Sequence, residues 1–258
     1  MVVGKYSNVN GLRIYHETDG TGVPLLLLHT AGTDGRVWRK MIESMPAGYK
    51  TIVPDLPGHG KSWPWTNWRK TRVDVRFYAD AISGLVEDLN LDRIVVLGCS
   101  IGADITIMLT TMIGNRIELA ICAEGAGKTN TFVEQDILKT DPGSVERAFD
   151  FCGRGASKDS IEDLIWIRSS NNRDIYIGDL LAWNNFDIMD DLPSIKNRIM
   201  LLRGEDDPVV SEAMLRDTSA RLEHSKYMTI PGFGHYPMIE KPAEFAKIVD
   251  SIIKSRDQ

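Results

Sequence analysis

The most informative segment of the chain reads Arg93-Ile94-Val95-Val96-Leu97-Gly98-Cys99-Ser100-Ile101-Gly102. Its apolar half is typical of a buried strand, and residues 103–113, which follow the Gly-x-Ser-x-Gly pentapeptide, have a helical pattern. A sharp turn from strand to helix holds its serine in a strained backbone conformation, with the hydroxyl exposed above the sheet edge. Gly98 and Gly102 suit such a turn because side chains there would collide. We therefore predict that Ser100 is a nucleophile, the alternative being an ordinary turn with a small hydroxyl residue.

Short apolar runs and helical patterns alternate along the rest of the chain. The runs span residues 25–28, 51–53, 94–97, 119–123, 199–202 and 227–230. They lack polar alternation, so we expect strands that are buried on both faces. Helical periodicity is clear between residues 77 and 89 and again between residues 245 and 253. Strands that alternate with helices predict an α/β fold with a mainly parallel central sheet flanked by helices.

Residues 125–196 break this alternation, because they contain helical patterns but no convincing buried strand. We expect a helical cap, or lid, inserted between two strands of the sheet. The predicted core therefore consists of residues 1–124 and 197–258, and the predicted cap of residues 125–196. Aromatic residues of the cap, Trp183 among them, are candidates for packing within the cap or for contact with a substrate.

Composition and charge exclude several classes of protein. The chain of 258 residues is 43% hydrophobic and 26% charged, as soluble globular proteins are. Its formal charge of -6 argues against a nucleic-acid partner and against a basic surface that binds membranes. The longest apolar run, residues 23–28, is too short for a membrane span, and residues 1–5 lack the features of a signal peptide. Three cysteines without paired spacing indicate reduced thiols, so we expect a soluble, cytoplasmic protein.

A nucleophilic serine needs a base, and His235 has the most suitable position of the five histidines. It lies in a glycine-rich segment between the last apolar run and the last helical pattern. A loop there places the imidazole at the carboxyl edge of the sheet, where ligands bind in open α/β sheets. We expect the other histidines to be solvated (His16 and His224), to brace a loop (His59) or to be structural or line the site (His29).

The third member of such a site is a carboxylate that orients the imidazole and stabilises its protonated form. Asp207 follows the apolar run 199–202, which also brings it to the carboxyl edge of the sheet. Glu124 ends the run 119–123, an unusual position for a charge unless it is paired or functional. We favour Asp207 as the acid and keep Glu124 as the alternative, while Asp206 is expected to point to solvent.

Over nearly its whole length the sequence resembles the α/β-hydrolase fold superfamily. The turn at Ser100 and the chain order Ser100, Asp207, His235 match that family. His29-Thr30-Ala31-Gly32, with Trp38 nine residues after His29, resembles its H-G-x…W oxyanion loop. Residues 54–62 are similar to its D-x-P-G-x-G-x-S loop.

The resemblance also implies how an oxyanion is held. The start of the predicted helix supplies the N–H of Ile101, and the family's second donor corresponds to the N–H of Ala31. Thr30 replaces the usual glycine of the loop. Its methyl and hydroxyl groups come close to the oxyanion site, which makes Thr30 a candidate substrate contact.

A finer resemblance concerns the acid. Residues 98–103, with Glu124 after the next apolar run, are similar to the lactonase branch that opens the macrolactone zearalenone. In that branch the acid comes from the position that matches Glu124. This chain departs from the branch because Asp207 is retained and the oxyanion loop differs, so Glu124 remains the alternative.

These observations lead to the hypothesis of a serine hydrolase that cleaves a carboxylic ester or lactone of a small, neutral, moderately hydrophobic molecule through an acyl-enzyme. Two alternatives retain the triad: hydrolysis of a diketone carbon–carbon bond or of a thioester, and a small-ligand receptor. Neither the histidines nor the cysteines have the spacing of a metal site, and no nucleotide-binding loop is present, so no cofactor is expected. The oligomeric state stays open, a homodimer being one option.

Overall fold

The computed structural model describes residues 2–129, 131–141 and 143–255. These residues form an eight-stranded sheet in the order β1-β2-β4-β3-β5-β6-β7-β8. The strands are β1 (Val3–Val9), β2 (Leu12–Gly20), β3 (Val23–Leu28), β4 (Tyr49–Pro54), β5 (Ile94–Cys99), β6 (Ile117–Ala123), β7 (Arg198–Gly204) and β8 (Ser225–Ile230). β2 pairs antiparallel with β1 and β4, and the other neighbours are parallel. The predicted α/β fold with a mainly parallel sheet is confirmed.

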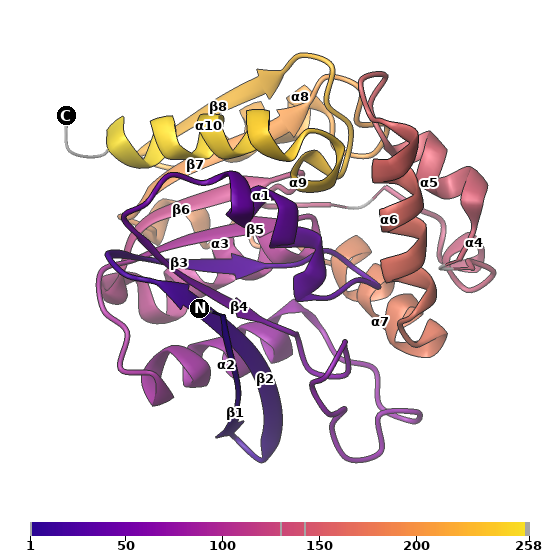
Figure 1. The fold of residues 1–258 in the computed structure, drawn as a ribbon, viewed down its shortest axis with the longest axis horizontal. Coiled ribbons are helices and arrows are strands. Elements are labelled where there is room, and N and C mark those ends of the chain that lie inside the picture. The colour runs from indigo at the N-terminus through magenta and orange to yellow at the C-terminus, as the bar shows by residue number, and fades with distance from the viewer. Residues whose placement is uncertain (1, 130, 142, 256–258) are drawn as a thin grey trace.

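Helices cover both faces of this sheet. Those outside the predicted cap are α1 (Arg39–Ser44), α2 (Val75–Asp88), α3 (Ile101–Ile113), α8 (Glu212–Ser219), α9 (Pro237–Glu240) and α10 (Pro242–Lys254), with the 3-10 turns η1 (Gly35–Trp38) and η2 (Gly114–Arg116). α1 and α10 lie on one face, and α2 and α3 on the other (Figure 1). Among the described residues, no helix combines the length and the apolar character that crossing a bilayer requires.

The two cores follow from the alternation of side chains along each strand. Leu25 and Leu27 of β3 pack in the cluster that contains Phe245 of α10. Leu26 and Leu28 pack in the cluster on the other face, with residues of α2 and α3. Successive strand residues point to opposite faces, so a strand covered on both sides needs an unbroken apolar run.

The segment predicted as a cap contains α4 (Glu134–Ile137), α5 (Val145–Phe151), α6 (Lys158–Ser169), α7 (Arg173–Asn184) and the turn η3 (Leu192–Ser194). α4 to α7 gather at one end of the sheet (Figure 1). Ser157 and Asn172 cap the N-termini of α6 and α7, because their side chains accept hydrogen bonds from backbone N–H groups of the first turn. The domain boundaries remain a prediction, and residues 1, 130, 142 and 256–258 of the predicted ranges lie outside the described residues.

Two expectations about exposure are wrong. β8 is an edge strand rather than one buried on both faces, and Tyr227 is 41% exposed. His16 of β2 is only 2% exposed, and its Nε2 lies 3.1 Å from Ser7 Oγ. His16 is buried because β1 pairs with β2 along its length. β1 is a mostly exposed strand that the sequence patterns did not predict.

Candidate active site

Ser100 occupies the turn between β5 and α3, with φ 56° and ψ -123°. A Cβ on Gly98 would lie 1.9 Å from the carbonyl oxygen of Gly102, and one on Gly102 would lie 2.3 Å from that of Leu28. Only glycine lets the turn pass this close to the neighbouring backbone. Positive φ at a serine is strained by about 1–3 kcal/mol, and strain of this kind concentrates at functional sites.

His235 approaches the same place from the loop between β8 and α9. Its Nδ1 lies 2.9 Å from Asp207 Oδ2, and its backbone N–H donates to Phe151 O over 2.7 Å. Asp207 is held in turn by the N–H of Val209, which donates to Oδ1 over 2.7 Å. No hydrogen bond joins the Ser100 hydroxyl to His235 in the described part of the chain. Such bonds often tighten only when a substrate is bound.

The pKa values of the two candidate acids are shifted in opposite directions. Burial raises the pKa of Asp207, but the charge of His235 and hydrogen bonds to the carboxylate outweigh it and hold the pKa at about 2. Burial raises the pKa of Glu124 well above its ordinary value, and the charge of Asp207 raises it further. The surroundings therefore favour the ionised form of Asp207 beside the imidazole and the neutral form of Glu124 behind it.

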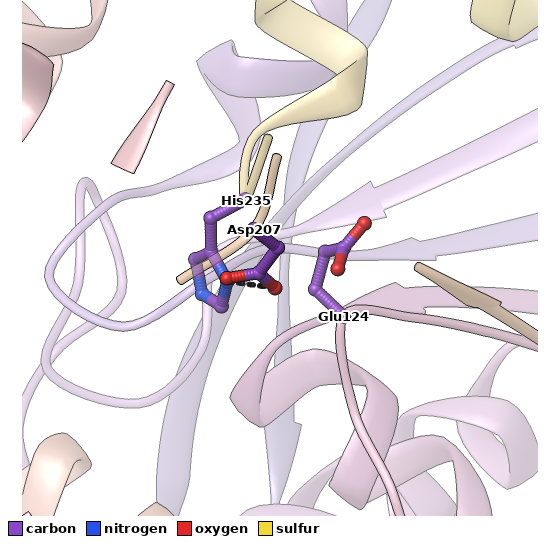
Figure 2. A group of neighbouring side chains, drawn as sticks. All are labelled: Glu124, Asp207 and His235. Carbon is purple, nitrogen blue, oxygen red and sulfur yellow. Dashed lines mark hydrogen bonds and ion pairs between the residues drawn. The ribbon is translucent and has the colours of Figure 1, made fainter. Parts of the chain in front are cut away.

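Figure 2 shows Asp207 between His235 and Glu124. Oε1 of Glu124 accepts from the N–H of Gly204 over 2.6 Å, while Oε2 has no partner of good geometry among the described residues. When protonated, Oε2 is a donor available to the Asp207 carboxylate. The geometry favours Asp207 over Glu124 as the residue that orients His235, and the assignment of the acid remains a prediction.

A metal site is a different interpretation of these three residues, because their polar atoms lie within 4.8 Å of one another. All three are buried, and the oxygens of Glu124 and Asp207 already accept backbone N–H groups. Nδ1 of His235 is used by Asp207. The donor set is therefore better suited to a hydrogen-bonded relay than to a cation.

The predicted oxyanion donors lie at the same site. Ile101 is the first residue of α3, and the N–H groups of a first helical turn have no acceptor within the helix. The N–H of Ala31 makes no hydrogen bond to another described residue, whereas its neighbour Gly32 donates to Asp179 Oδ2 over 2.9 Å. Both N–H groups are thus free to receive an oxyanion, which stays a prediction.

A narrow cavity opens at this site, and about 30 Å³ inside it is accessible to a water-sized sphere. Ser100, His235 and Ala31 line it from the core. Its apolar wall consists of Phe132, Phe151, Leu180, Trp183 and Val209, and its remaining lining residues are Thr30, Tyr176, Tyr236 and Arg168. The predicted substrate contacts Thr30 and Trp183 therefore both lie at the cavity, where their role is still a prediction.

Two histidines near the site are structural. Nε2 of His29 accepts the N–H of Leu56 over 2.9 Å, and burial, with the neighbouring charge of His59, lowers the pKa of His29 to about 4. Nε2 of His59 lies 2.7 Å from Asp179 Oδ2. His59 therefore braces its loop, as expected, but it does so against a helix of the predicted cap.

Two polar residues outside the cavity have different outcomes. His224 is half exposed beside Glu223, as expected. Asp206 does not point freely to solvent, because its side chain is 15% exposed and pairs with Arg154 over 2.8 Å. This expectation was wrong because Arg154 comes from the segment predicted as a cap, 52 residues away in sequence.

Two buried charged residues were not singled out from the sequence. Arg168 of α6 lines the cavity. Asp179 of α7 accepts from Gly32 and His59 through Oδ2 and from the Tyr78 hydroxyl, 2.7 Å away, through Oδ1. In the sequence, each residue is only a charged position within an amphipathic helical pattern. Such positions are usually exposed to solvent, so the pattern did not indicate burial.

Comparison with known proteins places the chain in a family. The model of the alpha/beta hydrolase family matches residues 25–248. Because this match covers most of the sequence, the chain belongs to that family.

Individual relatives are more distant. The magnesium-chelatase 30 kDa subunit of Rhodobacter capsulatus is 40% identical over 88 residues, which span 34% of this chain and 30% of that protein. A pimeloyl-[acyl-carrier protein] methyl ester esterase of Nitrosomonas europaea is 22% identical over 93% of this chain and 99% of its own length. An esterase from Exiguobacterium antarcticum superposes with a TM-score of 0.87 at 19% identity, covering 98% of this chain and 100% of that one. This last likeness shows the fold alone.

Proposed function

We propose that the protein is a serine hydrolase that cleaves carboxylic esters or lactones of small molecules through an acyl-enzyme. One observation carries the proposal: Ser100, on a strained turn, shares a cavity with His235, whose Nδ1 is bound by ionised Asp207. Membership of the alpha/beta hydrolase family supports it, as does the similarity to an esterase over most of the chain.

The chemistry follows from the orientation of the imidazole. With Nδ1–H bound to Asp207, the unprotonated Nε2 of His235 takes the proton of Ser100 as Oγ attacks the carbonyl carbon. The negative charge that forms on the carbonyl oxygen is held by the N–H groups of Ala31 and Ile101. The C–O bond to the alcohol breaks as His235 returns the proton to the leaving oxygen. Water then attacks the acyl-enzyme with the same base, and the free acid and the hydroxyl of Ser100 are released.

Replacement of the nucleophile tests this proposal. Ser100→Ala should lower kcat for a p-nitrophenyl butyrate substrate by roughly 10⁵- to 10⁶-fold, because the acyl-enzyme cannot form. Ser251→Ala, at an exposed position of α10, is the matched control and should retain full activity. Undiminished turnover by Ser100→Ala would exclude the proposed mechanism.

A substrate panel separates the proposed bond class from its alternatives. Esters, lactones, thioesters and diketones of similar size are assayed with wild type and Ser100→Ala. We expect Ser100-dependent turnover to be highest for esters or lactones. Highest turnover of a diketone or a thioester would keep the triad but change the reaction.

A further inference from the structure

Arg168 is a cation enclosed in the wall of the candidate active site. Its residue is 1% exposed, and it lines the same cavity as Ser100 and His235. Nη2 donates to the Tyr176 hydroxyl over 2.9 Å, and the guanidinium carbon lies 5.3 Å from the centre of that ring. Nε has no hydrogen-bond partner among the described residues.

No carboxylate in the described part of the chain forms an ion pair with Arg168. Two buried acids of the candidate site have other partners. Asp207 binds His235, and Asp179 binds His59 and the Tyr78 hydroxyl.

Glu240 is occupied as well, because its carboxylate accepts the backbone N–H groups of Gly153, Gly234 and Tyr236. The cavity wall itself contains no acidic residue among those described, only hydroxyl, apolar and imidazole groups beside the guanidinium. Arg168 therefore carries a positive charge that the protein does not balance at close range.

An unbalanced guanidinium at such a position is expensive. Transfer of a charged group from water to a protein interior costs several kcal/mol unless an opposite charge and full hydrogen bonding offset it. A guanidinium keeps its proton under these conditions, so it cannot escape the penalty by becoming neutral. Among the described residues, Arg168 donates a hydrogen bond only to a tyrosine hydroxyl, which leaves its guanidinium able to bind an anion that enters the cavity.

We propose that Arg168 binds a carboxylate of the substrate, so that the preferred substrates are esters or lactones with a second, ionised carboxyl group. This inference rests on the proposed function and replaces the expected neutral substrate with an anionic one. The planar fork of a guanidinium matches the two oxygens of a carboxylate. Phe132 and Trp183 line the same cavity and offer apolar contacts to the short carbon chain between the two ends of the molecule.

Matched substrates test the charge requirement directly. The mono-p-nitrophenyl esters of succinic, glutaric and adipic acid are each compared with the analogue whose free carboxyl is a carboxamide. For the chain length that fits best, wild type should prefer the carboxylate by roughly 10- to 100-fold in kcat/KM, as expected for a charge-assisted contact. Equal kcat/KM for all three pairs would overturn the inference.

Variants assign the preference to the guanidinium. Arg168→Met should reduce the ratio of kcat/KM for carboxylate over carboxamide to about one, and Arg168→Lys should retain part of it because the charge remains. Arg173→Met, at an exposed arginine on α7, removes the same charge from the same segment and should leave the ratio unchanged. A ratio that persists in Arg168→Met would show that Arg168 has only a structural role.

A measurement on wild type alone covers the case in which Arg168→Met fails to fold. Glutarate should inhibit hydrolysis of a neutral ester competitively and at least tenfold more strongly than glutaramide. Equal inhibition contradicts the inference. If Ser100-dependent hydrolysis of neutral esters is found without any carboxylate preference, the inference fails and the proposed function stands. If no ester or lactone is hydrolysed, the proposed function fails, and glutarate binding to wild type, measured calorimetrically, still decides whether the cavity takes a carboxylate.

Discussion

Asp207 and Glu124 both carry a carboxyl group, but different groups surround the two side chains. Asp207 faces the imidazole of His235 and the N–H of Val209, which stabilise its negative charge. Glu124 faces Asp207, so that ionisation of both would place two negative charges together in a buried site. One ionised and one protonated carboxyl group is the arrangement that such a pair favours.

The two acids are predicted to respond differently to amide substitution. Asp207→Asn should lower kcat by about 10⁴-fold, because the amide no longer holds the required tautomer of His235. Glu124→Gln should retain activity within about tenfold, since an amide N–H replaces the donor of a neutral acid. Steady-state kinetics on an activated ester measure both. An inactive Glu124→Gln beside a mildly impaired Asp207→Asn would reverse the assignment.

Glu124 also makes stability depend on pH. Its pKa is raised on folding, chiefly by burial. Its contribution to the free energy of unfolding is therefore complete below its unfolded pKa of about 4.5 and is lost as pH rises through the folded pKa. Glu124→Gln has no proton to lose at this site. Urea unfolding should therefore show the variant gaining stability relative to wild type between pH 5 and pH 9. A constant difference across that range would mean that Glu124 is ionised in the folded protein.

Motif and chain order predicted the positions of Ser100, His235 and Asp207, because a strand end followed by a turn is a local feature of sequence. Arg168 could not be found in this way. Arg168 lines a cavity that is built from segments far apart in the chain. The sequence shows only a single arginine in a helical pattern, which does not indicate that the side chain is buried at a cavity.

At the scale of elements, α7 is tied to the core through a buried charge. Asp179 holds His59, the Tyr78 hydroxyl and the N–H of Gly32, the residue that follows the predicted oxyanion donor Ala31. A single carboxylate thus links the segment predicted as a cap to the loop predicted to hold the oxyanion. His59, Tyr78 and Gly32 are 120, 101 and 147 residues away from Asp179, which is why no spacing rule could have shown the link.

Breaking this link is predicted to be costly. Asp179→Asn should lower the free energy of unfolding by about 3–5 kcal/mol, because it leaves a buried imidazolium without its partner. Asp163→Asn, which removes the exposed ion pair between α6 and Lys40, is the control and should change it by less than about 1 kcal/mol. Chemical denaturation of both variants measures the difference. Equal effects would show that the buried pair is no stronger than the exposed one.

The same link has a pH dependence of defined sign. Burial lowers the pKa of His59, but Asp179 outweighs burial and raises it above the ordinary value of 6.5. The stabilisation of the fold by the His59–Asp179 pair is therefore complete below about pH 6.5 and is lost as pH rises through the folded pKa of His59. The difference between wild type and Asp179→Asn should shrink on going from pH 6 to pH 9. A difference that grows with pH would contradict this assignment.

The central strands were predicted well, whereas the two edge strands were predicted only in part. β3, β5 and β6 lie in the middle of the sheet, where burial on both faces selects β-branched and leucine residues. β1 and β8 are the two edge strands: β1 was not predicted, and β8 was predicted as a strand but with burial on both faces. Their formation depends on pairing with a neighbour, which residue patterns record only weakly.

At the scale of the whole molecule, two buried carboxylates limit stability in acid. Burial raises the pKa of Asp34, but hydrogen bonds from Arg36 and Asn171 bring it down to about 2, and the pKa of Asp207 is also about 2. Each therefore contributes about 2 kcal/mol to the free energy of unfolding. This contribution is fully present above the unfolded pKa near 4 and is lost as pH falls toward 2. The urea midpoint should drop steeply between pH 4 and pH 2, and Asp34→Asn should make that drop shallower. An unchanged slope in Asp34→Asn would exclude its part in acid unfolding.

The central claim is that the fold presents one nucleophilic oxygen, Oγ of Ser100, at the candidate active site. Intact-mass spectrometry after treatment with an activated phosphonate ester, followed by peptide mapping, measures this directly. We predict a single adduct at Ser100, complete loss of esterase activity, and no adduct on Ser100→Ala. An active protein that forms no adduct, or an adduct at another residue that abolishes activity, would contradict the assignment of Ser100 as the nucleophile.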